Sequence, residues 1–293
     1  MTYIPVQGGL GNQLFIFAMA HYLEEEFDLD VVLTFKMDKH NQGHRDNYLE
    51  KFLENCTHNI TIKDGSMLNR FLRTIDKIDS ISHPAARSIK LFSKFVDFHD
   101  PEEFTSPNLR RSRIVRGFFQ SSELVDKVWP KIRVEFAKTI QLEHQRIINN
   151  LEISELRNQD EYQCIHIRRG DYLENSKTIG VLSKEYFHRN ASSEMRTIIT
   201  TDTFDDPSFC AEFSNLVLLN QNEINPVQAV AFMSYSNRFI MSNSTLSWWG
   251  SRLALENGGS VIAPRPWFIT TETNSRHKLH DARFQYSESI FES

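Results

Sequence analysis

The apolar positions of this chain form short runs that alternate with segments of helical periodicity. Short runs rich in branched and aromatic residues are typical of strands, and apolar residues that recur with each helical turn are typical of helices. Their repeated alternation predicts an α/β protein with doubly wound parallel sheets. We expect strands at residues 2–6, 30–35, 113–117, 162–167, 196–201, 216–219, 238–241 and 261–263. We expect helices after residue 12 and at residues 47–52, 67–75, 89–96, 122–150, 183–190, 225–233 and 248–256.

A polar stretch, RNQDEYQ at residues 157–163, separates the two halves of this pattern. The 293 residues of the chain are enough for two domains of ~150 residues each. We therefore expect an N-terminal domain at residues 1–155 and a C-terminal domain at residues 156–293.

Composition narrows the class of protein. With 40% hydrophobic and 24% charged residues, the chain resembles an ordinary soluble protein. Its net charge of -5 argues against a general nucleic-acid binder, which needs a basic face. The three cysteines show no CxxC spacing, so neither a disulfide framework nor a zinc site is indicated. No signal peptide or apolar run of transmembrane length is evident, so we expect a cytoplasmic protein without a transmembrane segment.

The segment CIHIRRGDY, residues 164–172, is a strand that ends in a cluster of charge. Arg168 and Arg169 carry planar guanidinium groups that suit phosphate oxygens. His166 and Asp171 add groups that can transfer or orient protons, and Gly170 permits a sharp turn. Open α/β sheets bind ligands at the carboxyl ends of their strands. The alternative is a salt-bridged arginine pair on the surface.

Two further turns join strands to helices and favour anion binding. In the first, Gly8, Gly9 and Gly11 precede a helix, with Asn12 at the expected N-cap. The second, residues 242–247 (SNSTLS), offers hydroxyls and free amides at a helix N-terminus, which suits a pyrophosphate. Tight packing is the alternative for the first turn, and simple helix capping is the alternative for the second.

Three acidic residues and a glutamine complete the list of polar candidates. Asp202 ends the strand at residues 196–201, where it can accept hydrogen bonds from a purine or a ribose. Gln120 follows the strand at residues 113–117 and can bind a hydroxyl. Asp28 and Asp30 form a DxD pattern typical of metal binding, but we place it in a helix-to-strand turn, away from the ligand-binding edge. No metal site is therefore expected.

Four segments resemble one enzyme family in their order and spacing: GGLGNQLFIFA (residues 8–18), GFFQSSEL (117–124), HIRRGDY (166–172) and SNSTLSWWG (242–250). They are similar to the α1,2-fucosyltransferases of glycosyltransferase family 11, the bacterial ones in particular. The resemblance implies a GT-B fold, with two Rossmann-like domains facing a central cleft. It also implies inverting transfer of L-fucose from GDP-β-L-fucose to O2 of a galactose residue, without a cofactor or a required metal.

The same resemblance implies roles for individual residues. Arg168 is expected to contact the β-phosphate and to be the most critical residue, with His166 supporting the fucose or the phosphate. Asp171 is a candidate base, although an ion pair with the arginines would make it a poor one. The remaining donor contacts are expected from Gly11, Asn12, Asp202, Asn243, Ser244, Thr245 and the backbone of Leu246. The segment TTDTFDD, residues 200–206, departs from the F-S-D-D pattern of the family.

The expected acceptor is a galactose-terminated glycan, such as an oligosaccharide or an O-antigen or capsule repeat at the inner face of the membrane. Acceptor recognition is expected in the first half, around residues 36–107, where the pattern names no single residue. Two alternatives remain open. One is a GT-B enzyme with another donor, such as GDP-mannose, and the other is a non-catalytic protein that binds a nucleotide sugar.

Overall fold

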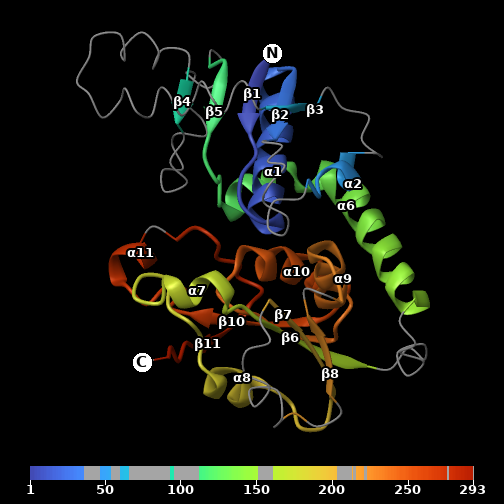
Figure 1. The fold of residues 1–293 in the computed structure, drawn as a ribbon, viewed down its shortest axis with the longest axis vertical. Coiled ribbons are helices and arrows are strands. Elements are labelled where there is room, and N and C mark those ends of the chain that lie inside the picture. Colours follow the sequence, from blue (N-terminus) through green and yellow to red (C-terminus); the bar gives the residue numbers. More distant parts are fainter. Residues whose placement is uncertain are drawn as a thin grey trace. The chain divides into compact units, whose positions relative to one another are not determined.

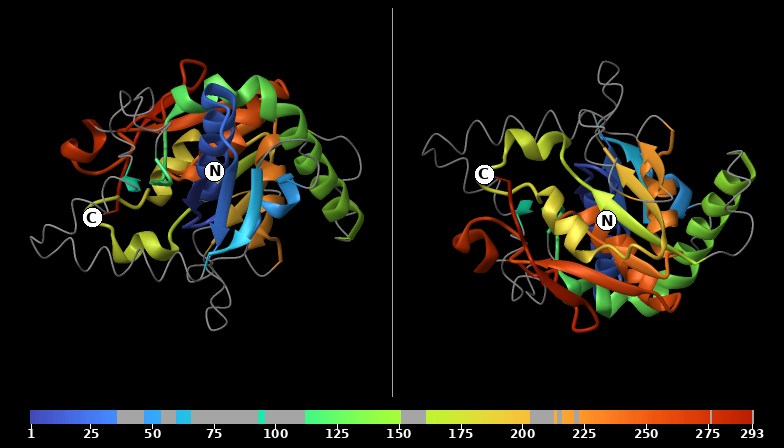
Figure 2. Two further views of the ribbon diagram at one scale, coloured as in Figure 1. Left: turned by 90° about the horizontal axis from the view of Figure 1, so that it is seen from above. Right: turned by 90° about the horizontal axis from the view of Figure 1, so that it is seen from below.

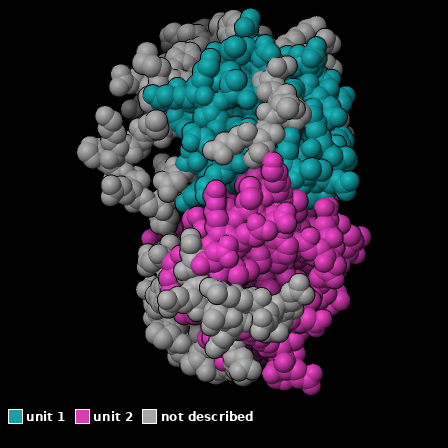
Figure 3. Space-filling view, turned by 90° about the vertical axis from the view of Figure 1, so that its right-hand side faces the viewer, with its two compact units in different colours: residues 1–136 teal, residues 137–293 magenta. Residues whose placement is uncertain are grey.

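The computed structural model describes residues 1–35, 47–53, 60–65, 93–95, 112–150, 161–202, 213, 216–220, 223–275 and 277–292. The chain forms two compact units, Met1–Phe136 and Ala137–Ser293, which Figure 3 colours separately. The division falls inside one long helix, α6 (Ser122–Asn150). The expected boundary at residues 155–156 lies outside the described residues and stays a prediction.

The first unit contains a five-stranded sheet with the order β3-β2-β1-β5-β4, in which all neighbours are parallel. Its strands are β1 (Thr2–Pro5), β2 (Val31–Phe35), β3 (Ile60–Asp64), β4 (Ser93–Phe95) and β5 (Ile114–Arg116). Its helices are α1 (Leu10–Phe27), α2 (Glu50–Leu53) and the first half of α6 (Figure 1).

Helix α1 forms the centre of this unit's core. Its side chains are buried from Leu10 to Leu23 with one partly exposed position, because the helix is apolar around most of its circumference. Phe17 packs near Phe52 of α2, and Phe52 stacks on Phe136 of α6 with ring centroids 5.0 Å apart. These contacts join α1, α2 and the first half of α6 in one aromatic cluster.

The second unit contains a six-stranded parallel sheet with the order β11-β10-β9-β6-β7-β8. Its strands are β6 (Tyr162–Ile167), β7 (Arg196–Thr201), β8 (Leu216–Asn220), β9 (Arg238–Ile240), β10 (Ser260–Arg265) and β11 (Gln285–Glu288). Its helices are α7 (Gly170–Glu174), α8 (Lys184–Asn190), α9 (Pro226–Ser234), α10 (Thr245–Glu256) and α11 (Thr271–Ser275), as drawn in Figures 1 and 2.

Strand β6 is buried on both faces, and its side chains alternate between two helical layers. On one face, the Tyr162 hydroxyl donates to the carbonyl of Phe232 in α9, and His166 reaches α10. On the other face, Ile165 packs in a cluster with Tyr186 of α8. Figure 1 shows the two layers, with α9 and α10 on one side of the sheet and α8 on the other. This is the apolar, two-sided burial typical of a parallel sheet.

Helices α9 and α10 pack very closely on their shared face. A Cβ atom at Gly250 would lie 2.6 Å from the Cβ of Met233, so only glycine permits this approach. Helix α9 is fixed at its start by a capping box, in which Asn225 and Gln228 bond each other's backbone. The close packing holds α10 against α9.

The α/β class is confirmed, and most expected elements are present within the described residues. Two expectations are wrong. Asn12 is not the N-cap of α1, because Gly9 occupies that position and places Asn12 inside the first turn. Within the expected helix at residues 89–96, Ser93–Phe95 is instead a strand, because it pairs with β5. Strands β3 and β11 and helices α7 and α11 were not expected, and the expected helix at residues 67–75 lies outside the described residues.

Cys164 is a buried free thiol, and burial raises its pKa, while Cys56 and Cys210 lie outside the described residues. Among the helices that the structure describes, none combines the length and the apolar character needed to cross a bilayer.

Candidate active site

The candidate site lies where the order of strands in the second sheet reverses. From β6 the chain adds β7 and β8 on one side, and then returns to place β9 on the other side of β6. Ligands of open α/β sheets bind at such a switch point, beyond the carboxyl ends of the strands. Strands β6, β7 and β9 are neighbours, so the three strand ends predicted to carry polar groups meet here.

Arg168 directly follows the last residue of β6. Its guanidinium group is the positive charge at the centre of the candidate site. One guanidinium nitrogen, Nη1, lies 2.8 Å from Oδ2 of Asp202, and the other, Nη2, donates to Oδ1 of Asp171 at 2.6 Å. Burial opposes the charge, but the carboxylates of Asp202 and Asp171 raise the pKa of Arg168 above its ordinary value. Arg168 is therefore a fixed cation whose side chain is partly open to a ligand.

Asp202 pairs with Arg168 and also binds the start of helix α7. Its Oδ1 atom accepts hydrogen bonds from the backbone N–H of Arg169, at 3.0 Å, and of Gly170, at 3.4 Å. A carboxylate at a helix N-terminus is stabilised by the free amides there. Gly170 thus begins a short helix rather than a sharp turn. Both carboxylate oxygens of Asp202 are engaged by the protein, and its expected contact with the nucleoside stays a prediction.

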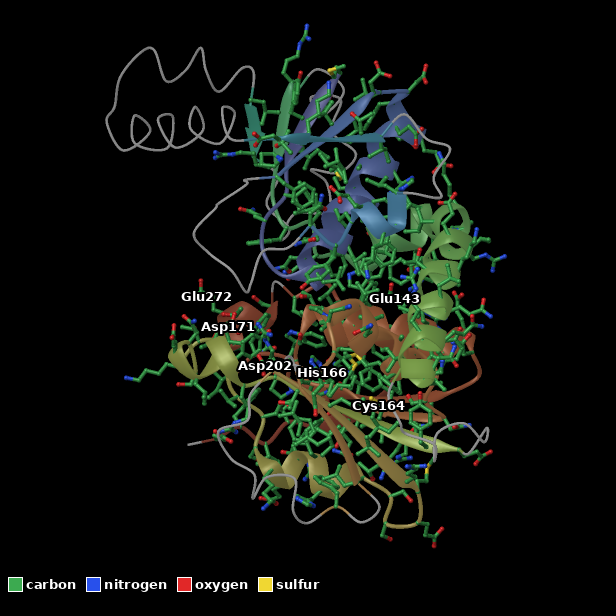
Figure 4. The ribbon with its side chains drawn as sticks, turned by 45° about the vertical axis from the view of Figure 1, so that its right-hand side comes forward. Glu143, Cys164, His166, Asp171, Asp202 and Glu272 are labelled. Atoms are coloured by element: carbon green, nitrogen blue, oxygen red, sulfur yellow. The ribbon has the colours of Figure 1, made fainter. Side chains whose placement is uncertain are left out.

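Asp171 lies on α7 and is the more exposed carboxylate of the site. Its side chain is 63% exposed, against 13% for that of Asp202. Figure 4 shows Asp171 and Asp202 on the same side of the sheet, and Arg168 contacts both of them. The ion pair foreseen as the alternative to a basic role is therefore present.

Tyr172 belongs to this cluster but was not singled out from the sequence. The guanidinium carbon of Arg168 lies 5.5 Å from the centre of its ring, and its hydroxyl donates to the carbonyl of Asn243 at 3.1 Å. Burial, reinforced by Asp171 and Asp202 and opposed by Arg168, raises the pKa of Tyr172 to about 12, so the phenol stays protonated. Its place in the same motif, four residues after Arg168, was the available signal.

His166 is a buried connector between β6 and helix α10. Its Nδ1 atom lies 2.5 Å from the hydroxyl oxygen of Ser247 and 3.3 Å from that of Ser242. Burial, together with nearby Arg168, lowers its pKa to about 3, so the imidazole is neutral at physiological pH. These contacts indicate that His166 orients the start of α10. The expected support of the fucose or phosphate stays a prediction.

The segment at residues 242–247 forms the N-terminus of α10, as the sequence indicated. Ser244 is the N-cap, and its hydroxyl accepts a hydrogen bond from the amide of Leu246 at 3.2 Å. The amide of Ser242 donates to the hydroxyl of Ser247. Capping therefore accounts for part of this polar run, while Thr245 and Leu246 remain partly exposed at a helix end that favours anions.

Asn243 ties this turn to two other loops. Its Nδ2 atom donates to the carbonyls of Gly180, at 3.0 Å, and of Trp267, at 3.1 Å. Its buried Oδ1 atom has no hydrogen-bond partner among the residues that the structure describes. The amide donors of Asn243 are thus used within the protein, and a direct contact with pyrophosphate stays a prediction.

In the first unit, the glycine turn after β1 meets the segment after β5. The two strands are neighbours, at the point where the strand order of that sheet reverses. Gln120 donates from Nε2 to Oδ1 of Asn12 at 2.9 Å, joining two of the segments that resemble the fucosyltransferases. Gly8 adopts a positive φ of 78°, and a side chain there would strike Asn12. Gly11 is buried in the first turn of α1.

No metal site is evident in the part of the chain that the structure describes. It contains no group of three or more His, Cys, Asp or Glu side chains placed to hold an ion. Asp28 is the C-cap of α1, and the carbonyl of Asp30 accepts the amide of Thr2, so the DxD pattern lies in the expected helix-to-strand turn.

Comparison of the chain with known proteins identifies its family. The model described as Glycosyl transferase family 11 matches residues 1–287. The chain belongs to glycosyltransferase family 11. It is therefore a glycosyltransferase, and the family predicted from its motifs is confirmed.

Two relatives of this family 11 glycosyltransferase are each 26% identical to it. An alpha-1,2-colitosyltransferase of Escherichia coli is 26% identical over 286 residues, which cover 92% of each chain. The O-antigen biosynthesis glycosyltransferase WbnK of Escherichia coli is 26% identical over 302 residues, covering 94% of this chain and 97% of the relative.

A solved structure supports the fold. The fucosyltransferase NodZ from Bradyrhizobium aligns with a TM-score of 0.51 and 12% identity, over 86% of this chain and 92% of that one. The two Rossmann-like parallel sheets of the GT-B class are thereby confirmed.

Proposed function

We propose that this enzyme transfers L-fucose from GDP-β-L-fucose to O2 of a galactose residue in an oligosaccharide or an O-antigen or capsule repeat. Family membership supplies the reaction class. The four motif segments favour the fucose donor, and the relative WbnK, described as an O-antigen biosynthesis enzyme, supports an O-antigen acceptor.

The observation that carries the proposal is the position of Arg168. It is held at the switch point of the sheet by Asp202, beside the N-terminus of α10. A guanidinium group and a helix N-terminus are complementary to a diphosphate. A lectin that binds sugar alone has no use for this combination.

Arg168 has one partner that a diphosphate can replace. The pair with Asp202 is shielded, whereas Asp171 is largely exposed. Phosphate oxygens entering the site would take the place of Asp171 at Nη2 and leave the pair at Nη1 intact. Asp202 would then position Arg168 during the reaction, and Ser244, Thr245 and Leu246 would line the same diphosphate from α10.

The proposed step is an in-line displacement at C1 of fucose. The bond from C1 to the β-phosphate oxygen breaks as a new bond forms to O2 of the galactose. GDP leaves with both bonding electrons, and Arg168 stabilises the charge that builds up on its β-phosphate. The hydroxyl proton passes to a base or to solvent, and inversion of the β-linked donor gives an α-linked product.

We also propose that this step needs no metal ion. The charge on the leaving diphosphate is met by Arg168 and by the N-terminus of α10. The only DxD pattern of the sequence lies in the turn between α1 and β2.

A related donor is the second candidate. One relative is described as an alpha-1,2-colitosyltransferase. Colitose is L-fucose that lacks one ring hydroxyl, so its GDP derivative presents the same diphosphate to Arg168. Only contacts with that hydroxyl would discriminate between the two sugars.

A donor panel tests the proposal. The purified chain is incubated with β-galactoside acceptors and GDP-L-fucose, GDP-colitose or GDP-mannose, and GDP release and product linkage are measured. We expect acceptor-dependent GDP release from GDP-L-fucose and an α-linkage to O2 of galactose by NMR. Preference for another donor would replace the fucose assignment. Binding of GDP-fucose without any transfer, across a broad acceptor array, would favour the non-catalytic alternative.

A further inference from the structure

The second arginine of the motif, Arg169, forms an ion pair that ties it to a distant part of the sequence. Its Nη1 atom bonds Oε1 of Glu292, and the two side chains are only 17% and 34% exposed. Arg169 is also the residue from which helix α7 starts, directly after Arg168. Glu292 therefore contacts the residue that directly follows Arg168 in the chain.

The segment around Glu292 is itself anchored to the loop that follows α7. The amide of Ser183 donates to the carbonyl of Ile290 at 2.7 Å, and the amide of Glu292 donates to the carbonyl of Val181 at 2.8 Å. Between them, Leu182 and Phe291 form an antiparallel bridge. Residues 290–292 thus pair with residues 181–183 as a short ladder.

A close contact at Gly180 completes this anchor. Gly180 has a φ of 83°, and a Cβ atom there would lie 2.6 Å from the ring of Phe291. The carbonyl of Gly180 also accepts the Nδ2 hydrogen bond of Asn243, from the turn before α10. The segment at residues 290–292 therefore touches both ends of the loop that includes Arg168 and α7.

We propose that Glu292 is a positioning residue for Arg168. By holding Arg169 against the ladder at residues 290–292, it fixes the start of α7. Asp202 fixes the same turn from β7, so the backbone of Arg168 and Arg169 is held from two sides. This inference rests on the proposed role of Arg168 toward a donor diphosphate.

The alternative is an ordinary surface ion pair, and the same segment provides a matched control. Glu288 pairs with Arg189 at 3.9 Å, and its side chain is 81% exposed. Exposed pairs of this kind contribute little to stability. Glu292→Gln and Glu288→Gln remove the same charge from positions only a few residues apart.

Two readouts compare these variants with the wild-type chain. The first is hydrogen exchange of the α7 amides, Gly170–Glu174, which needs no substrate. The second is kcat and KM for the sugar nucleotide identified by the donor panel. We expect Glu292→Gln to accelerate exchange in α7 and to lower kcat by about tenfold or more, because small displacements of a positioned group are costly. Glu288→Gln should leave both unchanged.

Unchanged exchange in Glu292→Gln would overturn the proposal, as would faster exchange with an unchanged kcat. Loss of exchange protection throughout the second unit would also overturn it, because that result indicates a general structural role. Failure of the proposed donor assignment is recognised separately, in the wild-type donor panel. In that case the exchange comparison still decides whether Glu292 holds α7.

Discussion

Arg168 and Asp202 lie side by side because the register of two neighbouring strands places them there. Ile167 of β6 pairs with Thr201 of β7, so the next residue of each strand faces the other, and the Nη1–Oδ2 distance is 2.8 Å. The same aspartate accepts two amides at the start of α7. Asp202 is thus the shielded partner of the arginine, while Asp171 is its exposed partner.

Asp202→Asn should weaken both the site and the fold around it. The amide side chain keeps the shape but loses the charge that balances Arg168 and attracts the α7 amides. We expect the free energy of unfolding to fall by about 1–3 kcal/mol, because a shielded charged hydrogen bond is lost. Transfer should fall by at least about tenfold, because Arg168 is no longer held in place.

Urea unfolding and kcat measurements check this prediction. Glu194→Gln, an exposed position before β7, provides the control and should behave as the wild type. An active and fully stable Asp202→Asn variant would show that the pair is incidental.

Asp171→Asn distinguishes the two interpretations of this residue. A general base contributes about 10²–10⁴-fold to the rate. An exposed ion pair contributes only about 0–1 kcal/mol. Because Asp171 is 63% exposed and paired with Arg168, we expect transfer to fall by less than about tenfold.

The measurement is kcat across a range of pH for Asp171→Asn, with Glu174→Gln on the same helix as the control. A fall of several hundredfold, together with loss of the acidic limb of the pH profile, would identify Asp171 as the base.

The architecture could be predicted from the sequence where the local pattern of apolar and polar residues agrees with their burial in the fold. Strand β6 was predicted from its apolar residues, and it is buried on both faces, as is typical of a strand in a parallel sheet. The serine-rich turn before α10 was likewise recognisable, because serine and threonine are common at helix N-caps and need no distant partner. Asp171 was expected to pair with the arginines if it was not a base, and that pair is present.

Other features depend on partners far away in the sequence. Ser93–Phe95 becomes a strand only because β5 lies beside it. Asn12 lost the N-cap position because Gly9 adopts the required extended conformation three residues earlier. The contact of Arg169 with Glu292 spans more than a hundred residues, so no local pattern predicts it.

Acidification should destabilise the protein through its buried histidines. Burial lowers the pKa of His166 and His277 to about 3 and that of His144 to about 4, from an ordinary value of 6.5. Below pH 6.5 the unfolded chain therefore binds protons that the folded chain does not. The contribution of these neutral histidines to the free energy of unfolding is complete above pH 6.5. It is lost as the pH falls toward 3 to 4, by about 1.4 kcal/mol per pH unit for each histidine.

Urea unfolding at pH 7 and pH 5 measures this dependence. The decrease in the free energy of unfolding from pH 7 to pH 5 should be smaller in His277→Asn, which removes one of these histidines outside the candidate site. Equal stability at the two pH values, or greater stability at the lower one, would contradict the assignment of neutral buried histidines.

Removal of divalent metals should leave the reaction intact. In the proposed step, Arg168 and the N-terminus of α10 supply the positive charge that a metal provides in other transferases. Transfer in the presence of EDTA should stay within about twofold of the untreated rate. Loss of activity in EDTA, restored by added Mg²⁺ or Mn²⁺, would contradict the metal-independent step.

Replacement of Arg168 tests its proposed role at the donor diphosphate. In Arg168→Ala, GDP release in the presence of donor and acceptor is measured alongside hydrogen exchange and thermal unfolding, with Arg189→Ala as a control at an exposed site. We predict that Arg168→Ala lowers kcat by about 10²–10³-fold or more while the fold is retained, and that Arg189→Ala transfers at the wild-type rate. Substantial transfer by a folded Arg168→Ala variant would contradict the account.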